Sequence, residues 1–276
     1  MDLEDIYFEI RPFGDDEVGE VLSRLFKDRE FLDTFGKYKL GNVFRISPTL
    51  CSLIVRYAIS RQFREVANVA KMQAIIRNYM DKMIQSTMSD LNVSGLKQLP
   101  RDKPYLFISN HRDIAMDPAF LNYVLHRDAR DTARIAIGDN LLSKSWVSDI
   151  MRLNKSFIVK RSLGGPRELL AAMRMLSKYI NHSIVIDKSS VWLAQREGRA
   201  KDGIDKTEPA IIKMLDLCRN KKDQIFSKHI SELKLKSAVL SSTDITLPFS
   251  GKQSLILLIL NGCNFPKQTI LKEISS

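Results

Sequence analysis

Apolar residues recur every three or four positions along residues 1–90, which is the spacing of amphipathic helices. The spacing predicts helices over residues 15–35, 49–59 and 63–88. The second helix has its apolar positions at Leu50, Leu53, Ile54 and Tyr57. Basic residues flank these positions: Arg56, Arg61 and Arg64. We interpret this segment as a core helix with a basic outer face; the alternative is a helix that lies on a membrane surface.

From residue 91 onward, short apolar runs alternate with helical segments. The runs predict strands over residues 92–94, 105–109, 133–138, 155–161 and 190–195. The intervening segments predict helices over residues 117–126, 143–152, 166–180 and 207–218. Such alternation is typical of a mainly parallel or mixed sheet flanked by helices. The predicted fold class is therefore α/β, with an N-terminal helical region over residues 1–90 and an α/β domain over residues 91–235.

The last part of the chain, residues 236–276, has a different character. Charged residues lose their periodicity there, and an aliphatic run over residues 255–260 is the main feature. We interpret this part as an atypical tail. One hypothesis is that the reading frame is interrupted near residue 235, which translation of the other two frames of the gene would test.

Composition and charge narrow the possible partners. The chain has 276 residues, and 43 Lys and Arg against 32 Asp and Glu give a net charge of +11. A basic excess points to an anionic partner: a phospholipid surface, a nucleic acid or a phosphorylated substrate. The cysteines have no metal-binding or redox spacing, which predicts a reducing compartment and no metal. The acidic N-terminus and the shortness of the apolar runs predict no signal peptide and no membrane span.

A histidine follows directly on the predicted strand 105–109. Ser109 and Asn110 break the apolar run, His111 follows at once, and two carboxylates, Asp113 and Asp117, come just after. Ligands usually bind where strands of an α/β sheet end. A neutral imidazole is the usual general base, and a carboxylate on its other ring nitrogen fixes the tautomer. The alternative is that His111 is a polar turn residue and both aspartates cap a helix.

Three segments, in this order, resemble motifs of the glycerolipid acyltransferase family: Asn110-His111 followed by Asp, the strand Ser156–Arg161, and Glu197-Gly198-Arg199. Members of that family move a fatty acyl group from acyl-CoA or acyl carrier protein to glycerol 3-phosphate or a lysophosphatidic acid. The resemblance covers about residues 90–215. Two further stretches, residues 10–17 and 195–203, look like a soluble bacterial subgroup of these acyltransferases.

The sequence departs from the family pattern in three places. The family places Asp behind four residues after the histidine, but five intervene before Asp117, so Asp113 is an alternative partner. Arg199 follows the glycine directly, and Lys201 is a candidate to share its role. A second histidine, His182, has the literal family spacing to Asp187, but it follows a helix and lies too close to the third motif. We interpret His182 as a helix-end residue.

The resemblance implies roles for the polar residues at the strand ends. His111 would be the general base, oriented by Asp117 or Asp113. Arginine holds phosphate through its planar fork of donors, so Arg161 and Arg199, with Lys201, would bind an acceptor phosphate. Glu197 would orient an arginine or the acceptor hydroxyl, and Gly198 would let the backbone approach closely. The alternative for the basic residues is a solvated rim.

The sequence therefore predicts an acyltransferase that acts on a glycerol-3-phosphate or lysophosphatidate-type acceptor. An acyl-CoA or acyl carrier protein thioester would be the co-substrate, with no cofactor. The expected location is cytoplasmic, at the inner face of an anionic membrane, and no nucleic acid is expected because the basic cluster over residues 152–201 contains few aromatics. The alternative is a catalytically impaired or truncated protein of the same fold that binds lipid or membrane through its basic charge.

Overall fold

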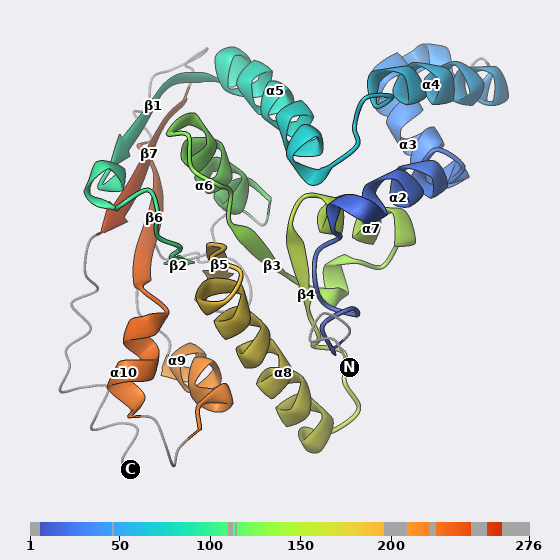
Figure 1. Ribbon diagram of the computed structural model, residues 1–276. Helices are drawn as coiled ribbons and strands as arrows, with labels where there is room; N and C mark the ends of the chain where they lie inside the picture. The colour runs from blue at the N-terminus through green and yellow to red at the C-terminus, as the bar shows by residue number, and fades with distance from the viewer. Residues whose placement is uncertain are drawn as a thin grey trace.

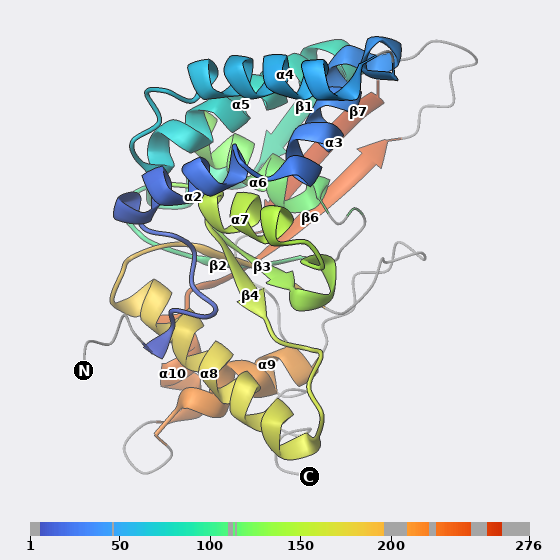
Figure 2. The same cartoon turned by 90° about the vertical axis from the view of Figure 1, so that its right-hand side faces the viewer.

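The computed structural model of the chain describes residues 6–45, 47–109, 113, 115–195, 209–220, 225–243 and 253–260. Within these residues, helices near the N-terminus lead into a seven-stranded sheet that has helices on both faces. Figures 1 and 2 show this arrangement from two directions at right angles. The predicted α/β class, with a mixed sheet and an N-terminal helical region, is confirmed.

The N-terminal part consists of two 3₁₀ helices, η1 (Asp15–Glu17) and η2 (Gly41–Arg45), and of α2 (Val18–Leu25), α3 (Arg29–Leu40), α4 (Pro48–Gln62) and α5 (Val69–Thr87). The prediction of one helix over residues 15–35 is wrong. Asp28 is extended and its carboxylate accepts the N–H of Phe31 at 2.9 Å, so it caps a new helix. Asn68 caps α5 in the same way, accepting the N–H of Lys71 at 2.9 Å, which starts that helix later than predicted.

The orientation of α4 is the opposite of the predicted one. The residues that it buries are Cys51, Val55 and Ile59. The apolar residues that we expected in the core are exposed instead: Leu50 by 57%, Leu53 by 58%, Ile54 by 53% and Tyr57 by 69%. In Figure 2, α4 lies along the outer side of the molecule, with α5 beneath it. The interpretation of α4 as a core helix with a basic outer face is therefore wrong, because its outer face is mainly apolar.

The sheet contains β1 (Met88–Ser94), β2 (Leu106–Ser109), β3 (Arg134–Gly138), β4 (Ser156–Val159), β5 (Val191–Ala194), β6 (Leu235–Thr243) and β7 (Gln253–Leu260). The strand order is β1-β7-β6-β2-β5-β3-β4. Only β6 and β7 pair antiparallel, and the other described pairs are parallel. The tail predicted to be atypical thus supplies β6 and β7 to the same sheet, while the boundary near residue 235 stays a prediction.

Helices of the α/β part cover both faces of the sheet. They are η3 (Leu96–Gln98), α6 (Met116–Arg127), η4 (Asp139–Leu141), α7 (Ser145–Leu153), α8 (Pro166–Val185), α9 (Pro209–Leu215), η5 (Asp216–Cys218) and α10 (Phe226–Glu232). Successive side chains of a strand point to opposite faces. Phe107 and Trp192 accordingly pack with α6 on one face, and Leu106, Ile108 and Leu193 pack with α8 and α9 on the other.

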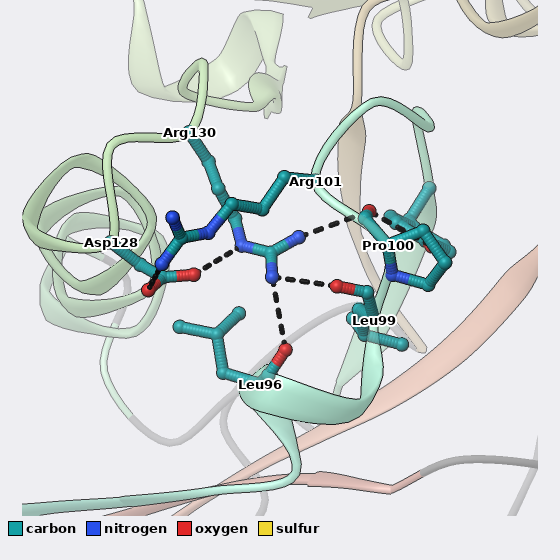
Figure 3. A network of polar contacts seen from close by, with 7 residues as sticks. Leu96, Leu99, Pro100, Arg101, Asp128 and Arg130 are labelled. Atoms are coloured by element: carbon teal, nitrogen blue, oxygen red, sulfur yellow. Dashed lines mark hydrogen bonds and ion pairs between the residues drawn. The ribbon is translucent and has the colours of Figure 1, made fainter.

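A buried arginine fixes the segment that leads into β2 (Figure 3). The Arg130 guanidinium donates to the Asp128 carboxylate at 2.7 Å and to the carbonyl oxygens of Leu96, Leu99 and Pro100 at 2.7–3.1 Å. Arg101 donates to the other Asp128 oxygen at 2.6 Å. Buried guanidinium groups need such partners for their N–H donors. The network therefore ties the β1–β2 connection to the end of α6 and sets where β2 begins.

The part of the chain that the structure describes contains no helix that is both long enough and apolar enough to cross a bilayer.

Candidate active site

The carboxyl ends of four parallel strands, β2, β5, β3 and β4, lie side by side at one edge of the sheet. Ser109, the last residue of β2, pairs with Ala194 of β5. The N–H of Gln195 donates to the Ser109 carbonyl at 2.8 Å, and the Trp192 indole donates to the Ser109 hydroxyl at 2.9 Å. The segments that follow β2 and β5 therefore leave the sheet next to each other, as expected for the strand-end motifs.

Five of the predicted site residues lie outside the described residues: His111, Glu197, Gly198, Arg199 and Lys201. Their neighbours Ser109 and Gln195 are described and lie in contact at the sheet edge. The roles assigned to these five residues remain predictions.

The two candidate partners of His111 occupy different positions in the turn before α6. Asp113 accepts the N–H groups of Ala115 at 3.0 Å and of Met116 at 2.9 Å, so one of its oxygens stabilises the start of the helix. Asp117 lies in the first turn of α6 and is 4% exposed. Its carboxylate accepts the N–H of Asp113 at 3.1 Å. Asp113 thus supports the start of α6, whereas the Asp117 carboxylate is buried against the turn; which of the two would orient His111 stays a prediction.

Arg161 lies just after β4, at the same edge as Ser109. Asp139, which follows β3, accepts the N–H groups of Arg161 at 3.1 Å and of Ser162 at 3.2 Å. A Cβ atom on Gly138 would lie 2.4 Å from the Asn140 amide oxygen and 3.3 Å from Arg161 Nε. The absence of a side chain at Gly138 therefore lets these groups pack closely over the end of β3. Arg161 itself is exposed and reaches a cavity beside the edge.

This cavity has a volume of about 860 Å³ and lies between the sheet and helices α8 and α9. Its walls are mainly apolar, with Ala136, Ile158, Leu176, Leu193, Ile211 and Met214 among the residues that form them. Charged residues that contribute to the lining, Glu9, Arg161 and Glu168, are exposed and stand at its rim. Lys160 is paired with Glu9 there. The volume falls in the range of ligand sites, and the lining suits an apolar group.

Gln195 is a site residue that the sequence did not single out. It lines the cavity, is only 7% exposed, and its side-chain oxygen has no hydrogen-bond partner among the described residues. Buried polar atoms without a partner are rare in native structures, because the cost of desolvation is not recovered. The available signal was a polar residue directly after the apolar strand Val191–Ala194, which is a common feature of strand ends.

The second histidine lies at the opposite edge of the sheet. His182 is in the last turn of α8, and its Nδ1 is 3.3 Å from the Asp187 carboxylate. Arg134, the first residue of β3, donates to the other Asp187 oxygen at 2.6 Å. The amino ends of parallel strands are not where ligands usually bind in α/β sheets. The interpretation of His182 as a helix-end residue is confirmed.

Over the described ranges, no three His, Cys, Asp or Glu side chains are close enough together to hold a metal ion.

Comparison with known proteins gave one family match. Residues 90–206 match the family model described as Acyltransferase. Among solved structures, the chain is similar to the crystal structure of the 1-acyl-sn-glycerophosphate (LPA) acyltransferase PlsC from Thermotoga maritima, with 13% identity and a TM-score of 0.42, over 89% of this chain and 94% of that one. The search of curated proteins gave no significant match.

Proposed function

Because residues 90–206 of this chain belong to the acyltransferase family, we propose that the protein moves a fatty acyl group from a thioester donor to an alcohol. The donor would be acyl-CoA or acyl carrier protein. The acceptor would be the hydroxyl of glycerol 3-phosphate or of a lysophosphatidate-type molecule. One observation carries the proposal: an apolar cavity of about 860 Å³ is lined by residues from the ends of β3, β4 and β5. Such a cavity suits the hydrocarbon chain of a donor, with a basic group, Arg161, at its rim.

In the proposed reaction, His111 takes the proton of the acceptor hydroxyl while the oxygen attacks the thioester carbonyl carbon. The new C–O bond forms, the C–S bond breaks, and the proton passes from the imidazole to the leaving thiolate. Asp117 holds the imidazole in the correct tautomer, as carboxylates do in related acid–base pairs. Arg161, Arg199 and Lys201 hold the acceptor phosphate, with Glu197 and Gly198 shaping that part of the site.

A thiol-release assay with long-chain acyl-CoA and either glycerol 3-phosphate or lysophosphatidate tests the proposal. His111→Ala should lower turnover by roughly 10²–10⁴-fold, the usual contribution of a positioned base. His182→Ala is the matched control and should leave turnover unchanged, because His182 lies at the other edge of the sheet. A loss in the control with full activity in His111→Ala would reassign the base. No thiol release by the unaltered protein with any acceptor would refute the proposed activity.

The outer face of α4 favours an anionic membrane surface as a partner. Leu50, Leu53, Ile54 and Tyr57 form an exposed apolar stripe, and the helix contains two arginines and no acidic residue. Exposed apolar side chains next to basic groups are typical of helices that lie on anionic membranes. We therefore propose a cytoplasmic, peripheral location at the inner face of a membrane. The same face would serve a lipid-binding protein without activity, which is the second candidate function.

A further inference from the structure

Three cations form a line along the exposed face of α8, which we call the α8 cation line. Arg174 and Lys178 lie seven and eleven residues after Arg167, and such separations return a side chain to nearly the same side of an α-helix. All three residues are exposed. The line is about 16 Å long, because each residue advances a helix by about 1.5 Å. The acidic residue of α8, Glu168, lies off this line: it lines the cavity and accepts the N–H of Gly164 at 3.1 Å.

The cations of the line differ from other cations of the α/β part in having no partner. Over the described residues, none of the three forms an ion pair or a hydrogen bond through its side chain. Arg130 and Arg134, by contrast, each pair with an aspartate at 2.6–2.7 Å. Arg174 and Lys178 are four residues apart, so they are neighbours on the helix and repel each other. An anionic partner that lies along the line would remove this repulsion.

The line is on the back of one wall of the cavity. The other side of α8 supplies apolar residues to that wall, among them Leu169, Ala172 and Leu176. A partner bound to the line would therefore be about one helix diameter, roughly 10 Å, from the cavity that would hold the acyl chain. A donor with a large body and a long arm can rest its body on α8 while its acyl group enters the cavity.

The surroundings of the line favour an acidic protein over a membrane or a nucleic acid. The exposed apolar stripe of α4, which would contact a membrane, lies at the opposite end of the molecule from α8 (Figures 1 and 2). The aromatic residue of α8, Tyr179, is buried, so this helix offers no ring on which a base could stack. Leu170 stands beside the line and is 43% exposed. An apolar side chain among charged ones is typical of a protein interface.

We propose that the α8 cation line docks an acidic helix of an acyl carrier protein, which would bring the acyl group as a thioester on its flexible arm. Carboxylates with the same separations along the partner helix would lie opposite the cations when the two helices pack side by side. The inference rests on the proposed function for its acyl donor. In the transfer, the acceptor oxygen forms the new ester bond, the C–S bond breaks, and the carrier thiol leaves with the acceptor proton.

Binding of a purified acyl carrier protein to the full-length chain, followed by calorimetry, tests the inference without requiring turnover. The double variant Arg174→Glu, Lys178→Glu reverses two charges of the line and should raise the Kd roughly tenfold or more. The control is Lys71→Glu, Lys82→Glu, which makes the same change of charge at two exposed lysines of α5. This control should leave the Kd unchanged. Binding by the unaltered protein should weaken as salt is raised, because salt screens exposed charges.

Three results would overturn the inference: no binding of the carrier by the unaltered protein, an unchanged Kd in the α8 variant, or an equal increase in the control. If the α8 variant does not fold, Arg174→Gln, Lys178→Gln removes the charges without reversing them, and an unchanged Kd there would overturn the inference equally. Sedimentation with anionic vesicles is the further check. A loss of vesicle binding with no loss of carrier binding in the α8 variant would assign the line to a membrane instead.

Thiol release from acyl-CoA and from the acyl carrier thioester separates this inference from the proposed function. The α8 variant should have a raised KM for the carrier thioester and an unchanged KM for acyl-CoA. Turnover of both thioesters with no effect of the variant on either KM would support the activity and refute the docking. Carrier binding that depends on the line, without transfer from either thioester, would support the docking and refute the activity.

Discussion

The indole N–H of Trp192 donates to the hydroxyl of Ser109 at 2.9 Å, between two neighbouring strands and with both residues buried. This bond fixes the end of β2 against β5, one residue before the segment that contains His111. Ser109→Ala removes the acceptor and should lower the free energy of unfolding by roughly 1–3 kcal/mol. Thermal unfolding measures the change. In a protein that already carries Trp192→Phe, Ser109→Ala should lower the free energy of unfolding by much less, because the bond is already lost. An equal decrease with and without Trp192→Phe would show that the bond is not the cause.

Asp117 and Asp113 make different contributions at the turn before α6. Asp117→Asn should lower kcat well below that of Asp113→Asn, because the buried Asp117 carboxylate faces the turn and would orient His111. Asp113→Asn should also unfold at nearly the same temperature as the unaltered protein, since asparagine accepts the helix N–H groups as well as aspartate does. Steady-state kinetics and thermal unfolding of both variants decide the matter. A larger kinetic loss at position 113 would make Asp113 the partner of the base.

Arg161→Lys keeps the positive charge at the rim of the cavity but loses the planar pair of donors that suits phosphate. The acceptor KM should therefore rise more than the donor KM. Arg167→Lys is the control: Arg167 is exposed in the first turn of α8 and is not part of the cavity lining. Each KM is measured by varying that substrate while the other substrate is kept at a saturating concentration. An effect confined to acyl-CoA would assign Arg161 to the donor.

The ionisation of Asp128 makes the free energy of unfolding depend on pH in the acid range. Hydrogen bonds from Arg101, and then from Arg130, lower the pKa of Asp128 below its ordinary value. A carboxylate whose pKa is lowered on folding stabilises the protein above its unfolded pKa, about 4, and this stabilisation is lost as pH falls through the folded value. Asp128→Asn should therefore be less stable than the unaltered protein at pH 7 and lose less stability on going from pH 5 to pH 2. Denaturant unfolding of both proteins between pH 5 and pH 2 measures how the free energy of unfolding of each depends on pH. An equal loss of stability between pH 5 and pH 2 in Asp128→Asn and in the unaltered protein would count against Asp128.

The exposed stripe on α4 should bind vesicles that contain anionic lipid at low salt. Leu53→Glu places a negative charge in the middle of the stripe and should weaken binding by roughly tenfold or more, through lost apolar burial and charge repulsion. Leu170→Glu makes the same change at an exposed leucine of α8, on the other side of the sheet, and should have little effect. Vesicle sedimentation measures the binding of the two variants. Comparing low and high salt isolates the electrostatic part of that binding, since salt screens it. Equal binding of the two variants would exclude α4 as the contact surface.

The sequence predicted the strands well because each is a short apolar run with a clear beginning and end. β2, β3 and β5 lie within a residue of the predicted limits. The helix boundaries near the N-terminus were less predictable, since Asp28 and Asn68 act as caps only once the backbone around them is extended. In α4, apolar residues occur on both faces, so periodicity could not tell which face is buried. Packing against α3 decides it, and this is a tertiary effect.

In the candidate site, the sequence predicted that Arg161 lies at the edge where the parallel strands end, and the structure places it there; the role of His111 stays a prediction. Gln195 was not predicted, because a glutamine after a strand is common and its significance comes from burial without a partner. The different positions of Asp113 and Asp117 in the turn also needed coordinates, since both lie close to His111 in the sequence. Hydrogen bonds to specific N–H groups separate them.

The pairing of β6 with β2 has a consequence for the nascent chain during its synthesis on the ribosome. The strand that leads to His111 pairs on one side with β5 and on the other with β6, whose residues are made long after it. Until that late segment emerges, one edge of β2 has its backbone donors and acceptors open to other chains, a template for aggregation. A nascent chain halted before residue 235 would expose the central strand of its own sheet, so a strand that is synthesised late protects the strand that leads into the proposed site.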